Sequence, residues 1–228
     1  TTSLPTPTIA DGSDHFETSI WTVPSGSANT TISGLSFAPD LLITKNRSQS
    51  YEGSVYDTVR GDDKYLKLFS GSGNAAESTA ATRVNLTSDG FVLEADNDNS
   101  NYTAGSNSVG WTWNAGTSTV SNTDGDVTSQ VRVNQTAGIS IVGFTPTSTN
   151  QAIGHGLNVV PSMVIYKNRA GYHWRVYHAS IGTSKSLFLN LNDAAAADND
   201  RVTAITSSTF TVGSIAANDD HIAYCFAP

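Results

Sequence analysis

Short segments rich in Val, Ile, Thr and aromatic residues recur from Phe16 to the end of the chain, separated by clusters of Gly, Asn, Asp and Ser. This punctuation is typical of β-strands joined by turns, at the spacing of a β-sandwich. It predicts strands near residues 16–22, 30–33, 40–45, 53–59, 64–69, 82–86, 90–94, 107–114, 128–134, 139–145, 150–153, 162–167, 174–178, 185–190, 201–205, 209–212 and 221–226. Residues 74–81 and 193–198 suggest helix, each about one turn long.

Two of the predicted strands carry continuous apolar runs, Leu41 to Ile43 and Met163 to Ile165. Such runs are typical of strands that are buried on both faces, so we expect both to lie centrally in a sheet. Residues 209–212 alternate instead, which predicts a strand with one face in water.

The pattern also occurs twice along the chain. Residues 39–47 return as 161–169, and both segments end in Lys-Asn-Arg. Further matching segments are 55–57 with 176–178, 88–91 with 207–210, and 109–113 with 222–226. The spacing between matches changes only in polar stretches, where loops absorb insertions at little cost. The repeat predicts an all-β protein of two fused antiparallel β-sandwich units, jelly-roll-like, related by internal duplication and pseudo-two-fold symmetry.

The same reasoning divides the chain into three parts. Residues 1–13 contain Pro5 and Pro7 and no alternation, which indicates an extended arm or linker. Residues 14–120 form the first sandwich copy and 121–228 the second. A turn at Asp124-Gly125 and an alternating strand at Val131 and Val133 make the junction structured. We therefore expect the copies to pack together and share a core.

Composition and charge exclude several classes of partner. The formal net charge of −8 argues against nucleic-acid binding and against anionic membranes. The single cysteine, Cys225, excludes an internal disulfide and a Cys-based zinc site. Charged residues make up 14% of the chain, so the surface is polar mainly through hydroxyls and amides, as is frequent in extracellular β proteins and virion parts. The chain has no signal peptide and no initiator Met, so we expect a processed or excised segment.

The repeated Lys-Asn-Arg motif, residues 45–47 and 167–169, has two interpretations. The two cations could hold a carboxylate or a sulfated sugar. Alternatively, Asn takes a left-handed turn position while Lys and Arg pair with nearby carboxylates. Repetition in register favours the structural interpretation. Trp111 and Trp113, matched by Tyr224 and Phe226, are likewise expected in the core.

The two copies differ around Tyr172, His173, Trp174 and Arg175, where the first copy has Tyr51-Glu52-Gly53. Aromatic faces stack on sugar rings, so these four residues are a candidate carbohydrate-binding site. A difference between copies is where a function acquired by one copy is expected. The alternative is that Trp174 is a half-buried strand residue.

An acidic loop offers Glu94, Asp96 and Asp98 as oxygen ligands at alternate positions, which calcium would accept. The loop lacks the glycine and the distant glutamate of an EF-hand, and a solvated hairpin tip is the alternative. We expect no other cofactor. The chain shows no nucleophile-elbow pattern and no His-x-x-x-His pair, so we expect no enzyme.

Several motifs recur together in this order: Phe37-Ala38-Pro39-Asp40, Val55 to Gly61, Ser88-Asp89-Gly90-Phe91, Trp111 to Gly116, Ser121 to Gly125, Gly154-His155-Gly156-Leu157, Val176-Tyr177-His178 and Ala223 to Ala227. Together they resemble an uncharacterised, duplicated β-domain family found in virion proteins of marine tailed bacteriophages. The resemblance covers residues 10–227 and assigns no catalytic or binding residue.

The resemblance implies an external structural component of a virion, either a tail-fibre or receptor-binding module or a capsid decoration protein. It implies contact with other virion proteins, a host-surface glycan as a possible partner, and assembly with further copies of the chain. The alternatives from the residues themselves are a carbohydrate-binding module, with or without calcium, and, less favoured, a polysaccharide depolymerase.

Overall fold

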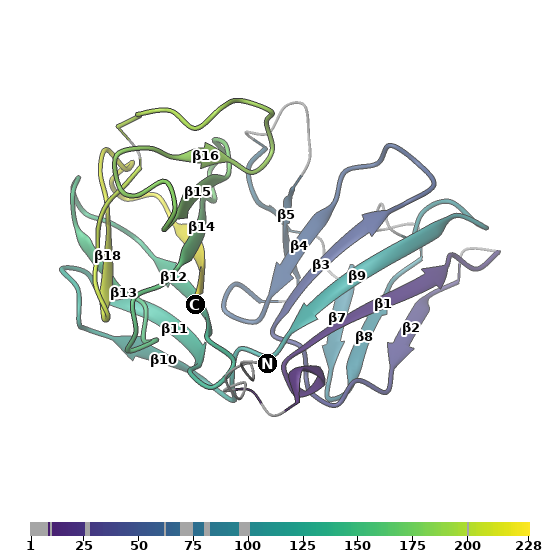
Figure 1. The fold of residues 1–228 in the computed structure, drawn as a ribbon. Coiled ribbons are helices and arrows are strands. Elements are labelled where there is room, and N and C mark those ends of the chain that lie inside the picture. The colour runs from purple at the N-terminus through teal and green to yellow at the C-terminus, as the bar shows by residue number, and fades with distance from the viewer. Residues whose placement is uncertain are drawn as a thin grey trace, which may run out of the picture.

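Antiparallel β-sheets account for nearly all the regular secondary structure in the computed structural model, which describes residues 9, 11–25, 28–61, 63–68, 75–79, 83–95, 101–199 and 201–228 (Figure 1). Helix among these residues is limited to one 3-10 turn, Gly12–Asp14. The predicted fold class, all-β with antiparallel sandwiches, is confirmed.

The first unit consists of a large sheet and a small one. Its strands are β1 (Phe16–Thr22), β2 (Thr30–Ser33), β3 (Leu41–Asn46), β4 (Ser54–Asp57), β5 (Lys64–Lys67), β6 (Ser78–Thr79), β7 (Val84–Thr87), β8 (Gly90–Leu93) and β9 (Asn107–Trp113). The large sheet has the order β1-β9-β3-β4-β5-β6, and the small sheet the order β2-β8-β7. The first strand therefore lies beside the last and the second beside the last but one, a jelly-roll-like wrapping.

The second unit also has a large and a small sheet. Its strands are β10 (Thr119–Asn122), β11 (Ser129–Asn134), β12 (Ile139–Phe144), β13 (Ala152–Gly154), β14 (Met163–Asn168), β15 (Arg175–His178), β16 (Leu187–Phe188), β17 (Val202–Ile205), β18 (Thr209–Val212) and β19 (His221–Phe226). The large sheet has the order β10-β11-β12-β19-β14-β15-β16, and the small sheet the order β13-β18-β17.

The two units share one strand order and one pairing register. Strands β1-β9-β3-β4-β5 correspond to β12-β19-β14-β15-β16, and β2-β8-β7 to β13-β18-β17. Trp113 pairs with Phe16 on one side and Leu41 on the other. Phe226 pairs with Ile139 and Met163 in the same way. These pairings join the residues that the sequence repeat matched. Descent from a duplicated segment and a two-fold relation between the units stay predictions.

Four sheets of described residues stack in layers, with the two large sheets facing each other in the middle (Figure 1). A large and a small sheet enclose a core in each unit, where Trp21 packs on Phe91 in the first and Phe144 on Phe210 in the second. Leu42 points into the first core, whereas Leu41 and Ile43 point toward the other unit. Burial on both faces explains the continuous apolar run of β3.

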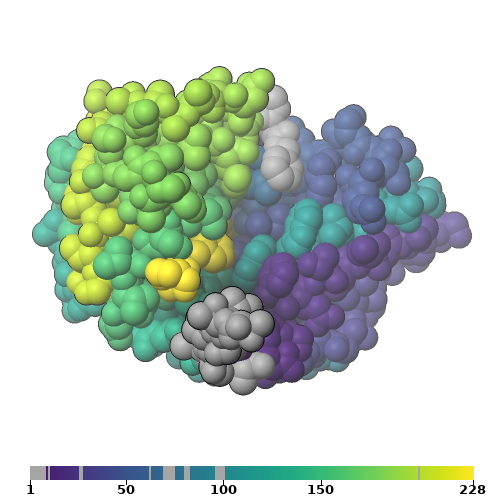
Figure 2. All heavy atoms as spheres, in the orientation of Figure 1, coloured from purple at the N-terminus to yellow at the C-terminus, as the bar shows by residue number. Residues whose placement is uncertain are grey.

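A further hydrophobic cluster joins the two large sheets, and it contains side chains of both units. Leu41, Val55 and Leu66 of the first unit meet Ile141 and Tyr224 of the second in this cluster, which we call the seam. Trp113 and Phe226 also meet there, with ring centroids 6.4 Å apart. Trp111, expected in the core, is not part of this cluster. In the space-filling view the two units lie against each other (Figure 2).

Buried charges accompany the seam. Arg60 binds Asp57 at 2.5 Å and Glu77 at 3.1 Å, and the Tyr224 hydroxyl donates to Asp57 at 2.7 Å. Glu77 in turn binds Arg169 of the second unit at 2.6 Å. Burial opposes the charge on Arg60, but the Asp57 carboxylate outweighs it and raises the pKa of the guanidinium. Burial raises the pKa of Tyr224 well above its usual value, so it stays a hydrogen-bond donor.

Two expectations about elements were wrong or incomplete. Residues 193–198 form no helix, because Ala196 pairs with Ser186 at the edge of the large sheet. Of residues 74–81, positions 75–79 are described and Ser78–Thr79 form β6, while 74, 80 and 81 lie outside the described residues. A single helical turn is unstable alone, and a sheet edge supplies backbone partners instead. Strands β6 and β10 were not predicted.

Candidate functional site

The Lys-Asn-Arg motif performs a structural task in both units. The ammonium of Lys45 donates to the Tyr51 carbonyl, and that of Lys167 donates to the Gly171 and Tyr172 carbonyls. Each lysine therefore fastens the loop that follows its strand. Lys45 is half-buried and Lys167 is buried, and this burial lowers the pKa of both amines, to about 8 for Lys167.

The asparagines of the motif cap the same loops. The Asn46 side-chain oxygen accepts from the backbone of Ser48 and Gln49, and that of Asn168 accepts from Ala170. Both asparagines lie in strands rather than in a left-handed turn, so that detail of the structural interpretation was wrong. Arg169 does pair with carboxylates, those of Glu77 and Asp220.

The candidate sugar-binding residues separate into two groups. Tyr172, His173 and Arg175 line one cavity, and Tyr172 is 61% exposed. Trp174 is only 1% exposed. Its indole nitrogen donates to the Lys67 carbonyl of the first unit at 2.8 Å, and its ring stacks on Tyr224. Trp174 as a sugar platform was therefore wrong, because its ring is buried in the seam, among residues of both units.

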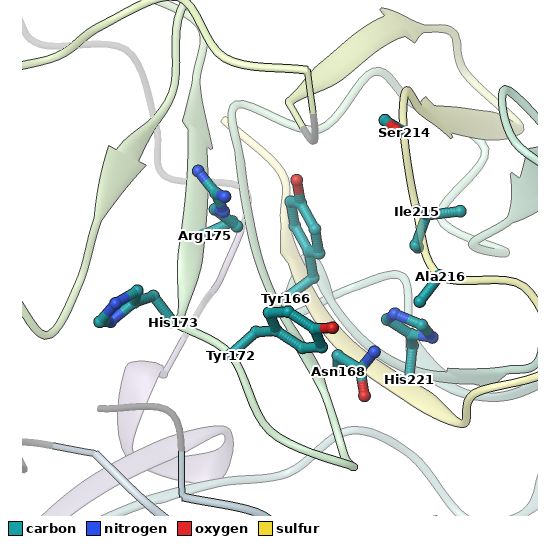
Figure 3. Close-up of a pocket in the computed structure, with 9 residues that line it drawn as sticks. All are labelled: Tyr166, Asn168, Tyr172, His173, Arg175, Ser214, Ile215, Ala216 and His221. Atoms are coloured by element: carbon teal, nitrogen blue, oxygen red, sulfur yellow. The ribbon is translucent and has the colours of Figure 1, made fainter. Parts of the chain in front are cut away.

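The cavity lies in the second unit, between strands β14 and β15 and the connection 213–220 (Figure 3). Its volume is about 270 Å³. The side chains that line it are those of Tyr166, Asn168, Tyr172, His173, Arg175, Ser214, Ile215, Ala216 and His221. Figure 3 shows the two tyrosine rings on one side and Ile215, Ala216 and His221 on the other. We call this cavity the β14–β15 pocket.

Neighbouring groups fix the two imidazoles of the pocket. The His221 ring stacks on Phe144, and its Nδ1 lies 2.8 Å from the Asp219 carbonyl oxygen. Burial lowers the pKa of His221, so the ring is neutral near pH 7. A carbonyl accepts only from N–H, which places the proton on Nδ1 and leaves Nε2 as an acceptor. His173 Nδ1 accepts from the Asn190 amide at 3.0 Å, which leaves its Nε2–H as a donor.

Arg175 is also held in place. Its guanidinium pairs with Asp198 at 2.5 Å and lies 4.4 Å from the centre of the Phe188 ring. Asp198 compensates part of its charge, and the aromatic contact orients the planar group. The pocket therefore combines an oriented cation, an imidazole donor, an imidazole acceptor and two phenol groups.

Tyr172 adopts an uncommon backbone conformation at the pocket mouth. Its φ angle is +67°, in the left-handed region that bulky residues avoid. Lys167 binds the carbonyl oxygens of Gly171 and Tyr172 and thereby holds the turn. Such strained residues cluster at ligand sites, where the surrounding structure keeps them in place.

The same position in the first unit is lined differently among the described residues. By strand register, Tyr166, Arg175 and His221 correspond to Thr44, Ser54 and Ser108, which are small and buried. The connection between the last two strands spans 94–106, longer than 213–220. Within it, Thr103 hydrogen-bonds the Tyr51 hydroxyl at 2.9 Å, and Tyr102 packs on the Tyr51 ring.

The sequence singled out Tyr172, His173 and Arg175 of this pocket, but not the buried residues Tyr166 and His221. Their counterparts Thr44 and Ser108 differ in size and polarity. The shorter connection at 213–220 was a second signal of an open site. Comparing the copies position by position would have found both.

The predicted calcium ligands lie mostly outside the described residues, where Asp96 and Asp98 belong. Glu94 is described, and its backbone carbonyl accepts from the Asn101 amide at 3.1 Å. Within the described ranges, no group of three His, Cys, Asp or Glu side chains is arranged to hold a metal. No helix in that part of the chain is long and apolar enough to cross a membrane.

Comparison with protein-family models assigns the chain to a family. A family model described as a domain of unknown function (DUF7483) matches residues 11–228. The chain therefore belongs to this family, and the match covers both units. Neither the curated proteins nor the solved structures contain a significant match.

Proposed function

We propose that this chain is an external structural component of a bacteriophage particle, acting as a rigid double module in a tail fibre, a receptor-binding part or a capsid decoration. The proposal starts from the resemblance of the sequence motifs to those of phage virion proteins. The architecture of the seam supports it.

The seam is the observation that carries the proposal. Two sandwiches joined only by a linker would move independently. Here Leu41, Val55 and Leu66 pack with Ile141 and Tyr224 in one cluster across the junction. Burial of a continuous apolar cluster makes separation of the units costly. A part that projects from a particle needs this kind of stiffness.

Directional contacts add to the apolar seam. Trp174 donates to Lys67 across it, and Arg169 forms a two-point ion pair with Glu77 at 2.6 and 3.0 Å. Arg132 of the second unit pairs with the buried carboxylate of Asp40 in the first, at 2.6 Å. Hydrogen bonds and ion pairs of fixed geometry specify one relative orientation, which apolar packing alone does less well.

Labelling of intact particles tests the proposal. An antibody against the chain, applied to particles purified from a lysate of the phage that carries the gene, should decorate an external feature in electron micrographs. An antibody against an internal virion protein should label only disrupted particles. The proposal fails if the chain stays in the soluble fraction while particles sediment. Release of reducing ends from host glycan would instead favour the depolymerase alternative.

A further inference from the structure

We propose that the β14–β15 pocket binds a single sugar ring, with the exposed face of Tyr172 stacked on it. The inference goes beyond the structural role, because it stands on the pocket itself and does not require the virion assignment. It also replaces Trp174 with Tyr172 as the aromatic platform.

The size of the pocket limits the ligand. Its volume of about 270 Å³ is near the lower end for ligand sites, which span roughly 300–1,000 Å³. It accommodates one ring and not a chain of rings. We therefore expect recognition of a terminal residue of a glycan or of a free monosaccharide.

The polar groups suit sugar hydroxyls. The neutral His221 offers an acceptor at Nε2, and His173 offers a donor at Nε2–H. Sugar hydroxyls both donate and accept, so they can satisfy either kind of group. Arg175, oriented by Asp198 and Phe188, adds a charge-assisted donor on the same wall.

Apolar and aromatic surfaces complete the site. Tyr172 and Tyr166 face Ile215 and Ala216 across the cavity, as Figure 3 shows. Mostly apolar walls with a few placed polar groups are typical of small-ligand sites. The C–H face of a sugar ring matches these walls, while its hydroxyls meet the histidines.

The first unit provides an internal control. It has corresponding strands, and Lys45 holds the loop after its strand as Lys167 does. There, however, the Tyr51 ring packs against Tyr102, and its hydroxyl hydrogen-bonds Thr103. A pocket required only for folding would be expected in both units. Among the described residues, the short connection and the large polar residues Tyr166, Arg175 and His221 occur together in the second unit, where the first has Thr44, Ser54 and Ser108.

The backbone strain at Tyr172 also supports a ligand site. Glycine adopts a φ angle of +67° without penalty, so a tyrosine there costs stability. The ring is 61% exposed and so gains little from packing in return. Presentation of its face to a ligand accounts for a bulky residue at this position.

Saturation-transfer NMR on the full chain tests the proposal with a panel of free monosaccharides: glucose, galactose, mannose, rhamnose, N-acetylglucosamine and N-acetylneuraminic acid. At least one should receive saturation from the wild-type protein. Tyr172→Gly should weaken that binding by about tenfold or more. Because glycine fits the backbone, the variant should melt at or above the wild-type temperature.

Tyr51→Gly in the first unit is the matched control and should leave binding unchanged. His221→Ala, which removes the acceptor on the pocket floor, should weaken binding of the same sugar. Two results would overturn the proposal: no saturation of any sugar by the wild-type protein, or equal binding by Tyr172→Gly. Because the assay uses purified protein, either failure leaves the particle-labelling test unaffected.

Discussion

Arg60 is buried between the units, where its guanidinium donates to Asp57, to Glu77 and to the Val55 carbonyl. A buried ion pair adds little stability over an apolar pair, yet removal of one partner is costly because the other charge remains unpaired. Loss of Arg60 alone should therefore lower the free energy of unfolding more than loss of both Arg60 and the Asp57 charge.

Arg60→Met should lower the free energy of unfolding by about 3–5 kcal/mol, because the Asp57 carboxylate stays buried without its partner. The double variant Asp57→Asn, Arg60→Met should recover part of that loss. Urea denaturation followed by tryptophan fluorescence measures both. The exposed Arg47 is the control, and Arg47→Met should change stability by less than about 0.5 kcal/mol. Equal effects of Arg60→Met and Arg47→Met would contradict the account.

Asp40 gives a pH-dependent prediction. Burial raises the pKa of its carboxyl to about 6, although Arg132 lowers it in part. Between about pH 4 and pH 6 the folded protein keeps a proton that the unfolded chain has released, so this group's contribution to stability falls as pH rises. The stability of wild type relative to Asp40→Asn should therefore decrease from pH 4 to pH 6.5 in urea titrations. An increase over that range would show that the ion pair with Arg132 outweighs burial and holds the pKa of Asp40 below its value in the unfolded chain.

At the scale of elements, the strands that carry apolar residues were predictable, because burial of one or both faces leaves a periodic pattern. β10 was missed because it is an edge strand of exposed, mostly polar residues, and β6 because it has only two residues. Trp174 was assigned wrongly, since it is buried at the junction of the two units, which leaves no local pattern. Tyr172, His173 and Arg175, which the divergence of the copies singled out, line one cavity, and sugar binding there stays a prediction.

Neighbouring side chains on paired strands also compensate one another in volume. Gly110 of β9 lies against Trp21, where an added Cβ would come within 3.2 Å of the indole. The corresponding residues of the second unit are Ala223 and Phe144, so a larger residue on one strand goes with a smaller ring on its neighbour. Both arrangements fill the same space in an equivalent core.

Gly110→Ala should therefore destabilise the protein by about 1–3 kcal/mol through overpacking. Adding Trp21→Phe, which reproduces the pair of the second unit, should restore part of that loss. Thermal melts of the two single variants and the double variant give the coupling between the positions. Strictly additive effects would show that the two cores are not equivalent at this position.

At the scale of the whole molecule, the seam makes the two units one structure. Residues from both large sheets share a hydrophobic cluster, and Glu77, Asp57 and Asp40 of the first unit bind Arg169, Tyr224 and Arg132 of the second. Most of this could not be read from the sequence. The repeat predicted a shared core, but which faces meet depends on contacts between distant segments.

Differential scanning calorimetry of the full chain tests this claim most directly. The account predicts a single transition whose calorimetric enthalpy equals its van't Hoff enthalpy, because opening the seam would expose the apolar cluster that both large sheets share. Two resolved transitions, or a calorimetric enthalpy about twice the van't Hoff value, would show that the sandwiches unfold independently and would contradict it.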